Sequence, residues 1–242
     1  METSPQPPSA DVLQRLSLAP VSVAEVTAEQ LVDDPPEIPW HITPPVGQIA
    51  MQLRSTVPRV AIGAGLARNS ELVDAVRNLP GVPAVVTSPA GGTFIVGGAA
   101  WLGLCAIGSP PPGQPMPLDW MLHSLHRWFK RALAPFGVAS SVQRVEGAWC
   151  PGFSDIAVDG RKLAGLGFRV TRERVVMRGV LAVRPMNDND FDVLVRTHRL
   201  IGIELRRDAA ISLAEAARRL DLDVAATIDA LRAVGTPGAV RD

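Results

Sequence analysis

The chain has 242 residues, and its charges balance, with 24 basic and 24 acidic side chains. This balance argues against a nucleic-acid or anionic-membrane surface, which needs a basic excess, and no apolar run approaches the ~20 residues of a membrane span. Two cysteines, Cys105 and Cys150, are too few for a disulfide framework. With no secretory signal pattern at the N-terminus, we expect a cytoplasmic protein with free thiols.

The N-terminal third begins with a Pro-, Ser- and Glu-rich stretch, residues 1–36, which predicts a flexible leader with one helix near 23–32. The elements expected after it are a strand at 38–43, helix-like spacing at 46–54, a strand at 58–63, and a helix at 69–79 capped by Asn69 or Ser70.

The middle of the chain alternates short apolar runs with turn residues. It predicts a strand at 83–86, a glycine-rich turn at 88–93, two neighbouring strands at 94–98 and 101–107, and a proline-rich loop at 109–117. Apolar residues then recur at three- and four-residue spacing over 118–135, which indicates an amphipathic helix.

The last hundred residues read as β-rich and then helical. Strands are expected at 141–149, 155–158, 162–171 and 175–184, with tight turns at Asp159–Gly160 and Arg172–Glu173, and helices at 190–200, from a capping box at Ser212–Glu215, and at 223–234. This order predicts an α+β fold with a mixed central β-sheet flanked by helices. The expected division is a leader (1–36), a catalytic domain (37–207) and a small C-terminal helical appendage (208–242).

Lysine is rare in this chain, with only Lys130 and Lys162 against 22 arginines. Lys162 lies in a strand-like stretch between Gly160 and Gly165, and Asp155 precedes it by seven residues across a tight turn. An ammonium beside a carboxylate keeps its charge and can hold a phosphate or a developing acyl oxyanion. The alternative is a surface ion pair that contributes little.

For each of the other candidate groups, a purely structural role is the alternative to a functional one. Gly91 and Gly92 follow a strand and allow close backbone approach to an anion, or they simply connect two strands. The Cys150 thiol is a nucleophile if a base or cation activates it, and otherwise a small buried hydrophobe, as Cys105 is expected to be. His123 and His126 share a helix face but lack acidic or cysteine partners at suitable spacing, so no metal site is predicted.

In order, these segments resemble the lipoate–protein ligase and octanoyltransferase family, which shares its fold with biotin–protein ligases. The resemblance covers Trp40 to Arg207. Its strongest part, Ser154–Gly165, is similar to the family block Asn-Asp-(apolar)-x-Val-x-Gly-(Arg/Lys)-Lys-(Ile/Leu)-x-Gly. Residues 85–93 align with the family turn Arg-Arg-x-(Ser/Thr)-Gly-Gly-Gly.

The resemblance implies roles for the candidate residues. Lys162 would hold the acyl carbonyl, and Asp155 would lie near an adenylate or its metal. Gly91 and Gly92 would back the acyl tunnel, and Thr93 and Gly165 would also bind the substrate or cofactor. Cys150 would match the nucleophile of the cysteine-dependent octanoyltransferases.

The implied activity is transfer or ligation of a lipoyl or octanoyl group onto a lysine of an acceptor lipoyl domain, with lipoate or an octanoyl donor, such as an acyl carrier protein, as substrate. Thr87–Ser88 replace the arginine pair, Gly97 and Arg178 replace histidines, and Ser154 replaces the asparagine. Losing two guanidiniums disfavours ATP and Mg²⁺. The alternative is a non-catalytic relative that binds an acyl ligand or a lipoyl domain.

Overall fold

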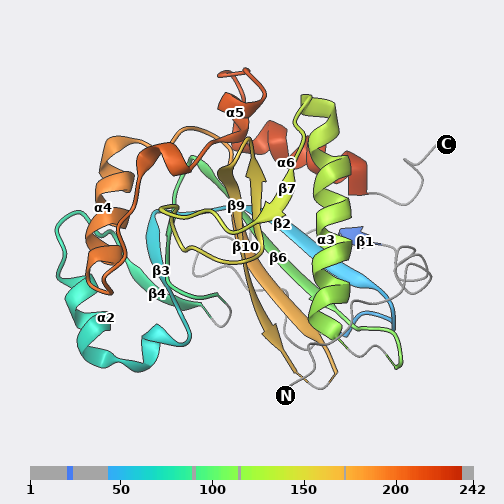
Figure 1. Cartoon of the computed structure of the whole chain (residues 1–242), viewed down its shortest axis with the longest axis horizontal. Helices are drawn as coiled ribbons and strands as arrows, with labels where there is room; N and C mark the ends of the chain where they lie inside the picture. The colour runs from blue at the N-terminus through green and yellow to red at the C-terminus, as the bar shows by residue number, and fades with distance from the viewer. Residues whose placement is uncertain (1–20, 24–42, 89–90, 114–115, 172, 236–242) are drawn as a thin grey trace, which may run out of the picture.

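The computed structural model describes residues 21–23, 43–88, 91–113, 116–171 and 173–235. These residues form a seven-stranded sheet in the order β1-β2-β6-β10-β9-β8-β7 and a three-stranded sheet in the order β4-β3-β5. Helices flank both sheets (Figure 1). The predicted α+β fold with a mixed sheet is confirmed, because β1 pairs parallel with β2 whereas the other neighbours in the large sheet are antiparallel.

The strands of the large sheet are β1 (Val21–Val23), β2 (Ile49–Ser55), β6 (Trp101–Gly108), β7 (Ser141–Gln143), β8 (Asp155–Val158), β9 (Arg161–Val170) and β10 (Val175–Ala182). Those of the small sheet are β3 (Arg59–Gly63), β4 (Val85–Ser88) and β5 (Phe94–Gly97). The helices are α2 (Ser70–Arg77), α3 (Pro117–Leu133), α4 (Asp188–Arg199), α5 (Leu213–Ala216) and α6 (Val224–Gly235), with single 3₁₀ turns at Leu66–Arg68, Ala134–Phe136 and Arg207–Ala209.

Strand β6 lies inside the large sheet and is buried along its whole length. It pairs antiparallel with β2 on one side and β10 on the other. The hairpin from β8 to β9 turns at Asp159–Gly160, where both residues have positive φ (48° and 74°). That conformation suits a two-residue turn between twisted antiparallel strands, so the predicted turn is confirmed.

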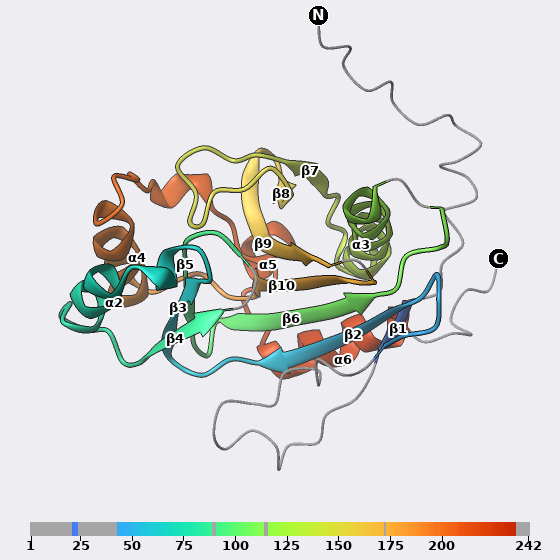
Figure 2. The ribbon, with the colours of Figure 1, turned by 90° about the horizontal axis from the view of Figure 1, so that it is seen from below.

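Helices α3 and α6 share the main hydrophobic core with the large sheet (Figures 1 and 2). Helix α3 starts with a proline in its first turn, where no helical hydrogen bond is lost. It buries one side, which includes Trp120, Leu125 and Trp128. Trp120 packs directly over Gly108 of β6, where a β-carbon would come within 2.6 Å of its ring.

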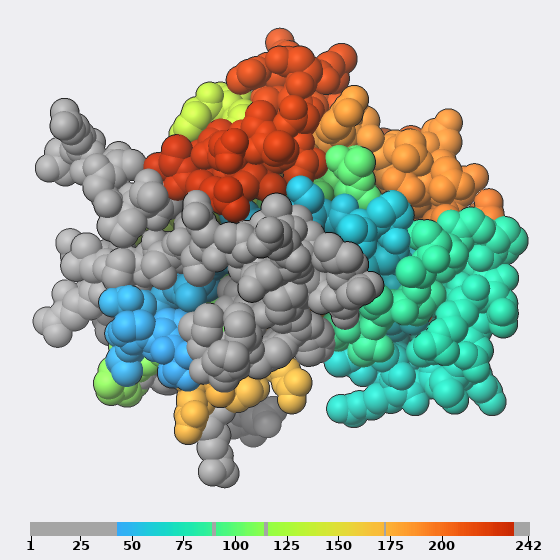
Figure 3. All heavy atoms as spheres, turned by 180° about the vertical axis from the view of Figure 1, so that it is seen from behind, coloured from blue at the N-terminus to red at the C-terminus, as the bar shows by residue number. Residues whose placement is uncertain are grey.

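The small sheet has its own core. Val60 and Ile62 of β3 alternate with Arg59 and Ala61, and Phe94 and Val96 lie in the same core cluster. This apolar side packs with residues of helices α2 and α4, which lie side by side at one end of the molecule (Figures 1 and 3). The same cluster includes Trp101 and Val180 of the large sheet, and the other side of β3 and β5, with Ala61 and Ile95, lines a cleft shared with the large sheet.

Three sequence expectations differ from the structure. A helix was expected at 46–54, but the chain forms strand β2 there. The spacing of apolar residues is compatible with a helix or a strand, and pairing with β6 selects the strand. The strand expected at 141–149 ends at Gln143, and the chain then leaves the sheet as a loop. The strands at 94–98 and 101–107 are separated by Gly98, at φ 152°, and belong to different sheets.

The C-terminal segment contains both helices that its sequence predicts. Ser212 and Glu215 form the capping box of α5, with the Ser212 amide donating to Glu215 Oε2 at 2.8 Å. Leu213 and Leu231 are buried in the main core. Apart from Val23, which ends β1, the helix predicted at 23–32 lies outside the described residues, as do nearly all of the strand predicted at 38–43 and most of the leader. Within the described ranges, no helix is both long and apolar enough to span a bilayer.

The contact between Gly108 and Trp120 predicts a matched pair of variants. Gly108→Ala forces the indole away from β6, and we expect it to lower the free energy of unfolding by about 1–3 kcal/mol. Gly65→Ala is the control, because nothing lies within 4 Å of a β-carbon there and its backbone is already right-handed helical. Guanidinium unfolding curves measure both, and equal stability of the two variants would contradict this packing.

Candidate active site

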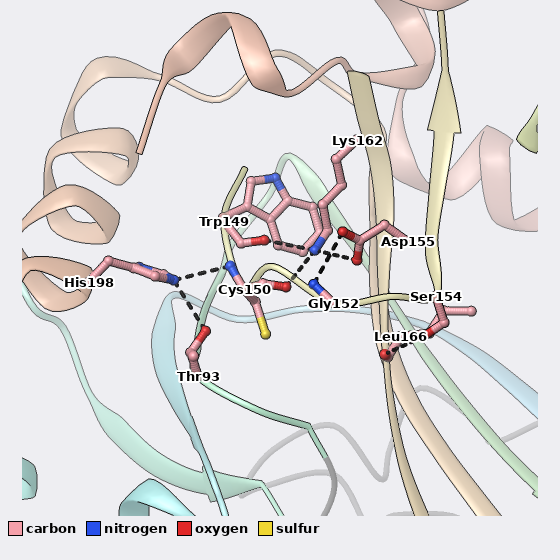
Figure 4. A network of polar contacts seen from close by, with 9 residues as sticks. All are labelled: Thr93, Trp149, Cys150, Gly152, Ser154, Asp155, Lys162, Leu166 and His198. Carbon is pink, nitrogen blue, oxygen red and sulfur yellow. Dashed lines mark hydrogen bonds and ion pairs between the residues drawn. The ribbon is translucent and has the colours of Figure 1, made fainter. Parts of the chain in front are cut away.

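The candidate site is built around the ammonium of Lys162, which has no exposed surface. Its Nζ forms an ion pair with Asp155 Oδ1 at 2.8 Å. It also donates to the carbonyl oxygens of Trp149 and Cys150, each at 2.7 Å (Figure 4). An ammonium has three donors, so all three are used within the protein.

The pair is buried rather than exposed, so the interpretation as a weak surface ion pair is wrong. Asp155 is also fully buried, and its second carboxylate oxygen accepts from the Gly152 amide at 3.3 Å. Burial lowers the pKa of Lys162 and raises the pKa of Asp155, while the attraction between them opposes both shifts. Such a pair tolerates burial only because its remaining hydrogen-bonding groups are also satisfied.

Trp149 covers the ammonium. Lys162 Nζ lies 4.1 Å from the Trp149 ring centroid, within the range of a cation–π contact. The indole and the lysine stem both fit because position 165 is glycine. A β-carbon at Gly165 would come within 2.6 Å of the Trp149 ring and 3.0 Å of Lys162 Nζ. Gly165, predicted to bind substrate, therefore makes room for the lysine.

Cys150 is held at both ends of its backbone. Its carbonyl accepts from Lys162, and its amide donates to His198 Nε2 at 3.1 Å. These two bonds keep the residue at φ 43°, a left-handed conformation that costs free energy for a side chain other than glycine. The half-buried thiol points away from Lys162 and Asp155 (Figure 4). Its charge would still raise the pKa of Lys162, so the two groups are electrostatically coupled.

His198 joins this loop to two other elements. The residue lies near the end of α4, is fully buried, and donates from Nδ1 to the carbonyl of Leu194 at 2.8 Å. A carbonyl can only accept, so Nδ1 carries the proton and Nε2 is the acceptor. Nε2 then receives the Cys150 amide and the Thr93 hydroxyl, the latter at 3.3 Å. Burial, with a smaller effect from Lys162, lowers the pKa of His198 to about 4.

The glycine turn reaches the same region through Thr93. Gly91 has φ 102°. A β-carbon built at this position would lie 4.0 Å from the Cα of Gly167 on β9. The carbonyls of Gly91 and Gly92 pack against Gly63 of β3, where a β-carbon would come within 2.6 Å. Gly91 and Gly92 therefore lie between the small sheet and β9.

The structure therefore brings together most of the residues predicted from sequence. Lys162, Asp155, Cys150 and Thr93 share one network, with the two glycines leading into Thr93. Sequence reasoning missed His198, although its four-residue spacing from Leu194 places it on the buried side of a predicted helix. It also missed Trp149, for which the sequence carried no signal. Within the described ranges, no group of three or more metal-ligating side chains is found.

Comparison with models of known protein families identifies the family of this chain. Residues 56–233 match the model of the lipoyl protein ligase A/B catalytic domain. The chain belongs to this family. A sequence comparison with curated proteins finds no match.

Several solved structures have a similar fold. Lipoate-protein ligase A bound with ATP is 14% identical, with a TM-score of 0.55 over 76% of this chain and 70% of that one. Protein Ta0514 of T. acidophilum with bound lipoic acid is 13% identical, with a TM-score of 0.56 over 76% and 69%. P. falciparum LipL1 in complex with lipoate is 14% identical, with a TM-score of 0.50 over 77% and 48%. At these identities the likeness concerns the fold.

Removing the Lys162 ammonium should lower the free energy of unfolding, because it breaks a buried ion pair. Lys162→Met leaves Asp155 buried without its counter-ion, and we expect a loss of about 3–5 kcal/mol in the free energy of unfolding. The double variant Lys162→Met/Asp155→Leu should recover much of this loss. Lys130→Met, which changes an exposed lysine, is the control. Denaturant unfolding of the wild type and the three variants measures these differences, and a Lys162→Met cost no larger than that of Lys130→Met would refute the arrangement.

His198 predicts a pH dependence. Its neutral form persists in the folded protein down to about pH 4, whereas an unfolded histidine takes up a proton below about pH 6.5. The unfolded state therefore binds more protons in this window, and stability falls by roughly 3 kcal/mol as the pH drops through it.

The contribution of His198 is isolated by comparing variants. His198→Gln should lose this part of the pH dependence, measured by unfolding at intervals between pH 7 and 4. His123→Gln, at an exposed histidine, should retain the full dependence. Parallel curves for wild type and His198→Gln would contradict a buried, neutral His198 with a lowered pKa.

Proposed function

We propose that this chain transfers a lipoyl or octanoyl group onto a lysine of an acceptor lipoyl domain. The observation that carries the proposal is the grouping of Lys162, Asp155 and Cys150 in one buried network inside a lipoyl ligase catalytic domain. The family membership supports lipoyl chemistry in general. The acceptor, the donor and the roles of individual residues are parts of the proposal.

Lys162 acts here through a fixed charge. Its three donors hold Asp155 and the loop carbonyls of Trp149 and Cys150. The ammonium therefore sets the position of the Cys150 backbone, while the thiol itself points away from it. A preorganised charge of this kind stabilises negative charge that develops during acyl transfer. To contact an acyl carbonyl directly, Lys162 would have to release one loop carbonyl.

The covalent route uses Cys150 as the nucleophile. The thiolate attacks the thioester carbonyl of an octanoyl donor, an S–acyl bond forms at Cys150, and the donor thiolate leaves and takes up a proton. The acceptor amine then attacks the acyl-enzyme, forms the amide, loses a proton and releases the Cys150 thiol. A reducing compartment, which we propose to be the cytoplasm, keeps this thiol free.

The second route is ligation of free lipoate with ATP. One solved relative carries ATP, but in this chain Thr87–Ser88 occupy the place expected for an arginine pair. The two routes differ in whether the donor arrives as a thioester or is activated at the site. They are separated by supplying each donor alone.

The test is incubation of the full chain with an acceptor lipoyl domain and either octanoyl-acyl carrier protein or lipoate with ATP and Mg²⁺. Intact mass spectrometry should show one acyl group on the acceptor. With the thioester donor, Cys150→Ala should abolish both the acyl-enzyme and the product, whereas Cys105→Ala, at the buried second thiol, should keep both.

Each alternative has its own signature. An acyl adduct that persists in Cys150→Ala removes the covalent route. Binding of the lipoyl domain or of an acyl ligand without any product, from either donor, would instead identify a non-catalytic relative. All three hydrogen-bond donors of Lys162 are already used within the protein, and this feature favours the non-catalytic function.

A further inference from the structure

The peptide group that joins Trp149 to Cys150 is held at both ends. Its carbonyl accepts from Lys162 Nζ at 2.7 Å, and its N–H donates to His198 Nε2 at 3.1 Å (Figure 4). The peptide is trans, so its C=O and N–H bonds point in opposite directions. The lysine and the histidine therefore hold this plane from opposite sides, and it cannot turn without breaking one of the two hydrogen bonds.

The next peptide group, between Cys150 and Pro151, is held at its carbonyl only. That carbonyl accepts from the same Lys162 ammonium at 2.7 Å, and a proline has no N–H that could donate on the other side. Lys162 thus fixes one edge of both peptide groups that flank Cys150. Among the described residues, the other edge is fixed by His198 alone.

The His198 ring offers this loop a hydrogen-bond acceptor because of how α4 and β5 hold it. Nδ1 donates to the Leu194 carbonyl, one helical turn earlier, at 2.8 Å, and the ring meets Phe94 edge to face with centroids 5.5 Å apart. The residue is completely buried, and burial lowers its pKa to about 4. The ring is therefore neutral near pH 7, and its free lone pair lies on Nε2.

The backbone of Cys150 requires such a hold. Its φ of 43° is a conformation that a side chain other than glycine keeps only where the surroundings fix it. Without an acceptor at Nε2, the Trp149–Cys150 peptide is free to turn, and Cys150 relaxes toward a negative φ. The direction of its Cα–Cβ bond then changes, and the thiol moves with it.

We infer that His198 is a positioning residue for Cys150. By accepting the Cys150 amide, it fixes the backbone conformation from which the thiol attacks the acyl donor, and it takes no part in making or breaking bonds. The inference rests on the proposed thioester route. It assigns to His198 an effect on the rate of acylation and none on donor affinity, because both ring nitrogens are already used within the protein.

Two variants separate the acceptor from the rest of the side chain. The side-chain oxygen of Gln reaches about as far as Nε2 and can accept the Cys150 amide. The side chain of Asn reaches only as far as Nδ1, so it can donate to the Leu194 carbonyl but offers Cys150 no acceptor. His123→Asn is the matched control, because the exposed His123 makes the same contact to a carbonyl one turn earlier, that of Asp119, at 2.7 Å.

Single-turnover acylation by octanoyl-acyl carrier protein, followed by intact mass over a range of donor concentrations, compares these variants. We expect His198→Asn to slow the maximal rate roughly 10- to 100-fold, with the donor concentration for half-saturation unchanged. His198→Gln should recover most of the rate, and His123→Asn should match the wild type. Equal losses in His198→Gln and His198→Asn, or a loss that appears only in the half-saturating concentration, would overturn the positioning role.

Hydrogen exchange tests the hold without any acyl donor. In NMR spectra of the full-length protein, the Cys150 amide should exchange at least about tenfold faster in His198→Asn than in the wild type. The internal control is the Arg206 amide, which donates to the Gly147 carbonyl of the same loop at 2.8 Å and should keep its rate. Faster exchange at both amides would indicate general loosening of the loop and contradict a specific role.

Failure of the inference and failure of the proposed function look different. If the thioester donor does not acylate the wild type, the covalent route is removed, and the role of His198 with it. If the wild type is acylated but His198→Asn reacts at the same rate, only the positioning role is overturned. An unprotected Cys150 amide in the wild type would also overturn it, so the test does not depend on the variants folding.

Discussion

The buried ammonium of Lys162 is the constraint on which the candidate site depends. A charge removed from water is tolerated only when its donors are satisfied and an opposite charge lies close. Asp155 and the carbonyls of Trp149 and Cys150 meet this demand. Because the three partners come from β8 and the loop before it, the lysine fixes that loop against the hairpin of β8 and β9.

The fixed loop then links elements that are distant in the chain. The Cys150 amide needs an acceptor, which His198 of α4 provides, and His198 also receives the Thr93 hydroxyl after the glycine turn. The large sheet, the small sheet and α4 are thus joined through one histidine and one lysine. The left-handed backbone of Cys150 persists because both of its peptide groups are held. This rigidity suits preorganised charge more than a mobile binding loop.

A cleft between the two sheets is lined by Arg54 of β2, Arg59 of β3 and Arg178 of β10. Glycines at 97 and 103 leave room for arginine side chains to lie across the strands. The cations that the glycine turn lacks at Thr87–Ser88 are present nearby on β2, β3 and β10. The positive charge of a site depends on which side chains come together in the folded chain. A motif in one segment of the sequence therefore does not predict it.

The sequence by itself determined the α+β class, the tight turn at Asp159–Gly160, the Ser212 capping box, and the adjacency of Asp155 and Lys162. Each of these follows from local periodicity or turn chemistry. It also pointed to Cys150 and the glycine turn, since the residue types and spacing resembled a known block. Strand β2 was misread as helical because its apolar spacing is compatible with both structures, and pairing with β6 decides between them.

Only the tertiary structure decided that Lys162 is completely buried with all three donors used, that His198 is a neutral acceptor for Cys150, and that Arg54, Arg59 and Arg178 share one cleft. These facts depend on contacts between segments separated by tens of residues, from β3 to α4. Local propensity carries no information about which strands become neighbours, and a residue's charge state depends on those neighbours through desolvation.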